Sequence, residues 1–243
     1  MVDFSRRGAL VTLLISLLVF SSFAAIGQES SNQASTTTVA TVNGETITRR
    51  ELTGAAQVRQ IVMSVSRQYR SFAQFLMSSQ PGQEFLGEYR KYVLDQLVKQ
   101  ELTSQKVEEL GITVSDEAVQ AEIAKIVEGN KQFQDKSDLE NYLKKNQQMA
   151  MADLKSRIRQ NLRAKKLQEE VTGKVTVSEE EIKSFYESNK KSYTGEDGNV
   201  KPLEEVEGQI RSTLKSRKQS KAYSQWLEQV RQKADIEKNT DQL

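Results

Sequence analysis

Apolar residues recur at helical spacing along most of the chain, so the sequence predicts a mainly α-helical protein. The first predicted helix covers about residues 49–79, and Pro81-Gly82 is expected to end it. A second helix continues to Leu110, and Gly111 occupies the position where glycine commonly terminates a helix. The two prolines of the chain both fall between predicted helices, where proline is tolerated.

Serine followed by acidic residues predicts the start of later helices, because a serine hydroxyl caps the free backbone N–H groups. Such starts occur at Ser115, at a Ser137–Glu140 capping box and in the Val175–Glu181 segment. Other helices are predicted over residues 151–171 and from Pro202 to about residue 234. Residues 215–221 of the last helix contain no apolar side chain, so this part either crosses solvent between packed regions or forms a solvated face.

A β-hairpin is predicted before the first helix. Two β-prone runs, Val39–Val42 and Thr46–Thr48, flank Asn43-Gly44, a dipeptide suited to a tight turn with positive φ. Thr48 and Glu51 then form a capping box that starts the helix. The A-D-I-E-K segment near the C-terminus reads as a short strand that pairs with this hairpin, which would bring the two ends of the folded region together.

The first residues have the features of an export signal. Arg6 and Arg7 precede the apolar run Leu10–Phe20, and small residues follow it. Residues 1–27 are therefore interpreted as a signal peptide that is cleaved, with an uncleaved membrane anchor as the alternative, since about 20 apolar residues span a bilayer. Residues 28–38 are polar and predict a flexible tether. Both readings place the rest of the chain outside the cytoplasm.

Composition excludes several classes of function. The chain has no histidine and no cysteine, which excludes Cys/His metal sites, Ser-His-Asp and Cys-His catalysis, and disulfides. The acidic residues lie on amphipathic faces and in helix caps, not in apolar surroundings that would raise their pKa. We therefore expect no enzyme activity and no cofactor. The net charge of +2, with both signs interspersed, argues against a nucleic-acid partner and against strong attraction to anionic lipid.

Several segments resemble, in order, the SurA and PrsA family of exported chaperones. They are Val39–Leu52, Gly111–Glu117, Leu139–Leu143 with residues 151–154 after it, Val175–Tyr186, and Pro202–Ile236. The resemblance implies a multi-helix chaperone module over residues 39–243, of the peptide-binding type shared by SurA and trigger factor. It further implies a helical sub-lobe at about residues 112–193 and a C-terminal helix, residues 203–234, that returns to the core.

The chain departs from this family at one place. Many members carry a parvulin-type prolyl isomerase domain before the last helix, whereas only eight residues separate Tyr193 from Pro202 here. The resemblance therefore implies an ATP-independent chaperone without isomerase activity, located in the periplasm or at another extracytoplasmic face of the cell envelope. Its partners would be unfolded or nascent exported polypeptides, including outer-membrane proteins awaiting assembly. The alternative is a membrane-tethered helical scaffold that binds one folded envelope partner.

Large apolar and aromatic side chains crowd the end of the first predicted helix and the start of the second. A holding chaperone needs adaptable apolar surface, which flexible and aromatic side chains provide. The candidate client-binding residues are Met63, Tyr69, Phe72, Phe75, Leu76, Met77, Phe85, Tyr89 and Tyr92. The alternative is that these residues form the packed interface between two antiparallel helices.

Overall fold

The computed structural model describes residues 37–147, 149–194 and 198–242. The predicted signal peptide and the predicted tether up to residue 36 lie outside these residues. The described residues divide into two compact units, one formed by those up to Ala164 together with those from Ala234 onward, and the other by those from Lys165 to Lys233. The sub-lobe expected at residues 112–193 coincides with neither unit, and that domain division stays a prediction.

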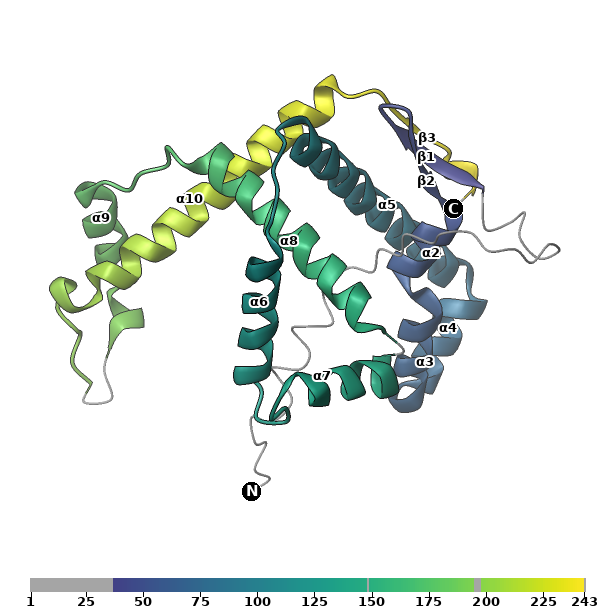
Figure 1. Cartoon of the computed structure of the whole chain (residues 1–243), viewed down its shortest axis with the longest axis horizontal. Coiled ribbons are helices and arrows are strands. Elements are labelled where there is room, and N and C mark those ends of the chain that lie inside the picture. The colour runs from purple at the N-terminus through teal and green to yellow at the C-terminus, as the bar shows by residue number, and fades with distance from the viewer. Residues whose placement is uncertain (1–36, 148, 195–197, 243) are drawn as a thin grey trace. The chain divides into compact units, whose positions relative to one another are not determined.

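A small antiparallel sheet joins the two ends of the first unit (Figure 1). Its strands are β1 (Thr38–Val42), β2 (Glu45–Thr48) and β3 (Ile236–Lys238), in the order β2-β1-β3. In the middle strand, Val42 pairs with Glu45 on one side and with Ile236 on the other. This confirms the mainly helical fold with a hairpin and a C-terminal strand paired to it.

The hairpin turn is also the point where the C-terminal segment attaches. Asn43 (φ 51°) and Gly44 (φ 87°) both have left-handed backbone conformations, as a tight hairpin turn requires. The Asn43 backbone N–H donates to the Asp235 carbonyl at 2.7 Å, and the Asp235 N–H donates to Asn43 Oδ1 at 2.9 Å. One turn residue therefore holds the chain immediately before β3.

Gln105 connects the same turn to the long helix α5 (Gln80–Glu109). Its Nε2 donates to the Val42 carbonyl at 2.9 Å and its Oε1 accepts from Asn43 Nδ2 at 2.7 Å. Gln105 Nε2 also donates to Glu101 Oε1 at 2.9 Å, while burial raises the pKa of the Glu101 carboxyl. The turn, the last strand and α5 are thus linked by one group of amide side chains.

Three short helices stand where a single helix was predicted over residues 49–79. They are α2 (Arg49–Ala56), α3 (Val58–Gln68) and α4 (Arg70–Ser78). The predicted Thr48–Glu51 capping box starts α2, but the helix then breaks at Gln57, which has a left-handed φ of 46°, and again at Tyr69. The prediction of one continuous helix was wrong. Neither break carries a glycine or a proline, so the sequence gives no local sign of it.

The expectation that Pro81-Gly82 ends a helix was also wrong, because both residues lie in the first turn of α5. Ser79 caps this helix, and its hydroxyl accepts from the Gly82 N–H at 3.1 Å. Proline suits a first turn, since its missing N–H would have no intrahelical partner there. Gly82 also lets α4 come close, because a Cβ at this position would lie only 2.6 Å from Leu76 Cα.

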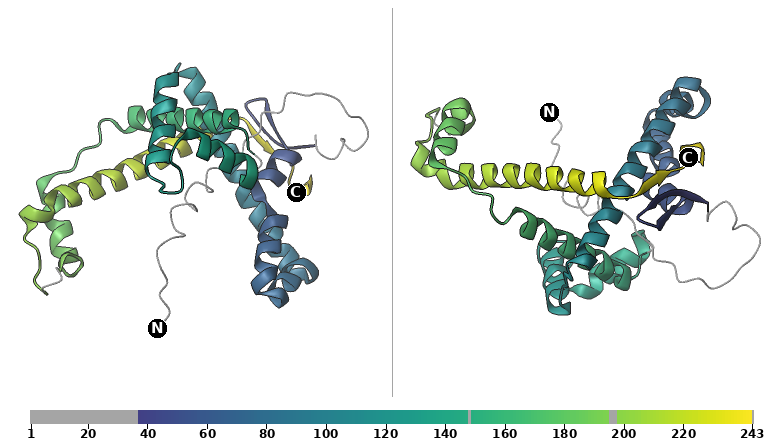
Figure 2. Two further views of the ribbon diagram at one scale, coloured as in Figure 1. Left: turned by 60° about the horizontal axis from the view of Figure 1, so that its bottom comes forward. Right: turned by 90° about the horizontal axis from the view of Figure 1, so that it is seen from above.

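The core of this part of the first unit lies where the sheet and α2 meet α5. α5 contacts both β1 and α2, and each contributes fully buried or nearly fully buried apolar side chains. These are Val39, Val42, Leu52, Leu94, Leu97, Val98 and Leu102. α3 and α4 pack against each other, and α4 packs on α5 (Figure 2).

A second apolar cluster in the first unit joins α6 (Asp116–Glu128), α7 (Lys136–Tyr142) and the start of α8 (Met151–Thr172). A π-helical turn, Leu143–Gln147, follows α7. Ser115 caps α6 as predicted, its hydroxyl accepting from the Ala118 N–H. The predicted Ser137–Glu140 capping box is wrong, because the carboxylate of Asp135 caps α7 by accepting from the N–H groups of Ser137 and Asp138.

The second unit contains α9 (Glu179–Asn189) and α10 (Leu203–Lys233), which pack through Ile182, Tyr186, Val206 and Ile210. Ser178 and Glu181 form a capping box at the start of α9. Lys218 of α10 donates to Glu181 at 2.7 Å and lowers the pKa of that carboxyl. The apolar-free stretch at residues 215–221 is therefore part of a continuous helix, and one of its lysines forms an ion pair with α9.

Replacing Asn43 should destabilise the first unit. Asn43→Ala removes two side-chain hydrogen bonds and puts alanine, which rarely adopts positive φ, in a left-handed conformation. The free energy of unfolding should therefore fall by about 2–3 kcal/mol. Asn43→Gly keeps the backbone conformation and should lose only about 1–2 kcal/mol. Urea denaturation followed by circular dichroism measures both. Asn161→Ala, at an exposed site of α8, is the control and should not destabilise.

Two glycines of α5 should respond in opposite directions to alanine. In Gly82→Ala the new Cβ overlaps the backbone of α4, so the free energy of unfolding should fall by about 2 kcal/mol. In Gly87→Ala the new Cβ meets open space within a helix, so stability should rise by about 0.5–1 kcal/mol. Thermal unfolding of both variants measures the difference. Equal behaviour of the two would contradict the close approach of α4 to Gly82.

Candidate functional site

The candidate site is the segment formed by α3, α4 and the start of α5, residues 58–92, which we call the apolar tip. Seven of the nine candidate residues expose between 45% and 61% of their surface, a large fraction for side chains of this kind. They are Met63, Tyr69, Phe72, Phe75, Met77, Phe85 and Tyr92. Ile61, which was not among the candidates, is exposed in the same segment.

The other two candidates lie in the same segment but are less exposed. Leu76 is buried, with 5% of its surface exposed, and Tyr89 is half-buried. Leu76 lies opposite Gly82, where α4 approaches α5, so it belongs to the packed helix interface that was the alternative reading. The other seven side chains leave 45% or more of their surface exposed.

The apolar tip contributes little to the core. α3 has no buried residue, and α4 buries only Ala73 and Leu76. Phe72 and Phe75 lie next to each other with stacked rings, 6.3 Å between centroids and 15° between planes. Amphipathic helices usually bury their apolar face against the protein, so two helices with so few buried residues leave apolar surface free for a partner.

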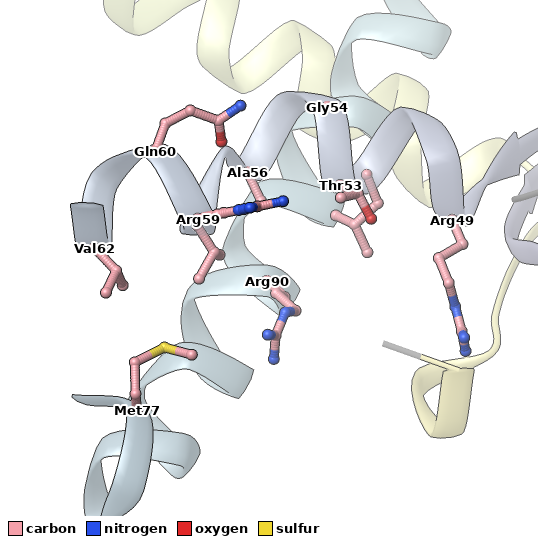
Figure 3. A pocket seen from close by; sticks show the side chains of 11 residues that line it. Arg49, Thr53, Gly54, Ala56, Arg59, Gln60, Val62, Met77 and Arg90 are labelled. Carbon is pink, nitrogen blue, oxygen red and sulfur yellow. The ribbon is translucent and has the colours of Figure 1, made fainter. Parts of the chain in front are cut away.

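A groove of about 740 Å³ lies beside the exposed residues, bordered by α2, α3, α4 and α5 (Figure 3). Its apolar lining includes Leu52, Ala56, Val58, Val62 and Met77. Met77 is also one of the seven exposed residues, so the groove and the apolar tip are continuous. A concave, mostly apolar space with a few polar groups is the usual form of a binding site.

Sequence reasoning missed the three arginines that border this groove, Arg49, Arg59 and Arg90. Arg49 donates from Nε to the Gln242 carbonyl and from NH2 to Gln242 Oε1, both at 2.9 Å, so its partners are neutral. In the described parts of the chain, Arg59 and Arg90 form no ion pair. The sequence carried a sign of this charge, because no Asp or Glu occurs from Leu52 to Gln83.

The described residues give no sign of a metal or membrane-spanning site. Within residues 37–147, 149–194 and 198–242, no group of three or more acidic side chains is arranged to hold a metal ion. None of the helices in these ranges is both long and apolar enough to cross a bilayer. The chemistry offered by the site is therefore that of exposed apolar surface bordered by guanidinium groups.

The sequence of the chain is similar to a protein family and to several named proteins. A family model described as the SurA-like N-terminal domain matches residues 1–168. A foldase protein PrsA of Clostridium botulinum is 28% identical over 159 residues, which are 65% of this chain and 46% of the relative. The foldase protein PrsA of Caldanaerobacter subterraneus is 33% identical over 159 residues, 64% of this chain and 44% of the relative. The chain thus matches somewhat less than half the length of these relatives.

The fold has a counterpart among solved structures. One chain of the Campylobacter jejuni proteins PEB4 and Cj1289, described as two structurally related SurA-like chaperones, superposes with a TM-score of 0.53 at 14% identity. The superposition covers 83% of this chain and 98% of that one. The resemblance stated from the sequence is therefore confirmed. With its family model covering more than half of its length, this chain belongs to the SurA-like N-terminal domain family.

Proposed function

We propose that the chain is an ATP-independent extracytoplasmic chaperone that binds unfolded or translocating polypeptides through the apolar tip, without prolyl isomerase activity. The observation that carries this proposal is the exposure of seven large side chains on helices that contribute little to the core. An ordinary monomeric protein would bury much of this surface. The relatives named as PrsA foldases support the same role, and the SurA-like chaperones, of which Cj1289 is named as periplasmic, support the role and the location.

The tip suits clients of varied sequence. Met63 and Met77 are unbranched and polarizable, so they can adapt to side chains of different shape. Aromatic side chains such as Phe72 and Phe75 offer large apolar area with few rotatable bonds. Fully burying one such side chain contributes roughly 1.5–3 kcal/mol, but an unfolded client loses conformational freedom on binding, so the affinity should be modest.

Two features support binding without isomerase activity. The eight residues between Tyr193 and Pro202 are too few for a further domain, since domains usually have 50 residues or more. The chain also has no histidine, so a parvulin-type site that contains histidine has no counterpart in it. The proposed activity is therefore holding of clients, with no covalent step.

Replacing the stacked pair Phe72 and Phe75 by serine should weaken client binding. We expect the dissociation constant for an unfolded outer-membrane-type polypeptide to rise about tenfold or more in the double variant, because apolar contact area is lost. Both side chains are exposed, so thermal stability should change little. Titration with a fluorescently labelled client measures the change. The control is Leu110→Ser, an equally exposed apolar residue at the opposite end of α5, which should bind normally.

The same titration with the folded form of the client separates the two readings of the site. Saturable binding of the unfolded form alone supports the chaperone. Absence of binding to both forms, or normal binding by the double variant, would contradict it. A membrane-tethered scaffold would instead bind one folded envelope protein and be indifferent to unfolded chains.

A further inference from the structure

The apolar tip is locally cationic, although the chain as a whole is almost neutral. The chain has 33 acidic residues among 243, yet the 52–83 stretch has none. The same stretch contains Arg59, Arg67 and Arg70, and Arg90 follows on α5. The net charge of +2 therefore conceals a concentration of positive charge around the exposed apolar residues.

The acidic residues nearest to the groove in sequence are engaged with other groups. Glu51 accepts from the N–H and the hydroxyl of Thr48 in the cap of α2. Glu84 accepts from Gln80 Nε2 at 2.9 Å, and Glu88 pairs with Lys91 at 2.7 Å. In the described part of the chain, none of these carboxylates forms an ion pair with Arg59 or Arg90.

The guanidinium groups border an apolar surface. Arg59 comes from α3 and Arg90 from α5, and Figure 3 shows both beside the groove that Met77 enters from α4. Arg49 borders the same groove from α2, and its hydrogen-bond partners among the described residues are the neutral groups of Gln242. A ligand that fills this groove gains most if it presents an apolar side chain and a carboxylate close together.

We propose that the apolar tip and its groove select client segments in which acidic residues flank aromatic or large aliphatic residues. This inference rests on the proposed chaperone function and names the class of client. Arginine suits the role because its planar guanidinium binds a carboxylate through two parallel hydrogen bonds and remains charged at all physiological pH values. The concave groove holds side chains of a polypeptide, whereas a flat bilayer surface would leave it unfilled.

The test uses the purified chain and three unstructured peptides with one shared aromatic and aliphatic sequence, flanked by Glu, Gln or Lys. Fluorescence anisotropy measures each dissociation constant. At about 0.1 M ionic strength the Glu-flanked peptide should bind roughly three- to tenfold more tightly than the Lys-flanked peptide, as expected for a few exposed ion pairs. At about 1 M salt, where charges are screened within roughly 3 Å, the difference should disappear while apolar binding persists.

A matched pair of variants assigns the preference to the groove. The double variant Arg59→Gln with Arg90→Gln should lose the preference for Glu flanks, so that its dissociation constants for the Glu-flanked and the Gln-flanked peptides become similar. Lys131→Gln with Lys174→Gln removes the same amount of charge at exposed positions outside the tip and should keep the preference. Thermal unfolding confirms that both variants remain folded.

Each outcome decides between the proposals. Equal binding of the three peptides overturns the acidic preference and leaves the chaperone function standing, whereas binding to none of them overturns the chaperone function itself. Vesicles of anionic and of zwitterionic phospholipid complete the test. Stronger binding to the anionic vesicles than to the Glu-flanked peptide, lost in the Arg59→Gln and Arg90→Gln variant, would assign the charge to a membrane surface and overturn the preference for acidic clients.

Discussion

The pairing of β1 with β3 is the interaction on which the arrangement of the first unit depends. It joins a strand that ends at Val42 to one that begins at Ile236, and the Asn43 turn adds hydrogen bonds to Asp235 and to α5. An ion pair between Lys238 and Asp95 ties the last strand to the same helix. Because β1 is buried between two strands and packs on α5, it provides a fixed base from which α2 starts.

Stability and binding surface are separated along the first helices. α2 and the central part of α5 bury large apolar side chains, whereas α3 has none buried and α4 is held mainly through Ala73 and Leu76. Regions with few buried contacts open most easily, so the tip should be the part of this unit that adjusts most readily to a client. The close contact at Gly82 limits that adjustment, because it fixes the junction of α4 with α5.

The sequence predicted the hairpin, its turn, the C-terminal strand and most helix starts, because each depends on local chemistry such as Asn-Gly turns and serine caps. It did not predict the breaks at Gln57 and Tyr69, because neither residue is a glycine or a proline and the apolar positions continue at helical spacing past both. Periodicity marked the apolar residues of the tip but could not distinguish buried Leu76 from its exposed neighbours, since that difference depends on α5. The three arginines of the groove lie on three different helices, so only the tertiary fold brings them together.

The central position of β1 also sets an order in time. During synthesis the chain emerges from its N-terminal end, so β2 can pair with β1 as soon as the hairpin is free. The other edge of β1 has to wait until residue 238 has emerged, almost two hundred residues later. Until then the unpaired N–H and C=O groups of that edge are available to any extended segment nearby, as is usual for an open edge strand. The first unit therefore remains incomplete for most of the chain's own synthesis, and its sheet is completed last.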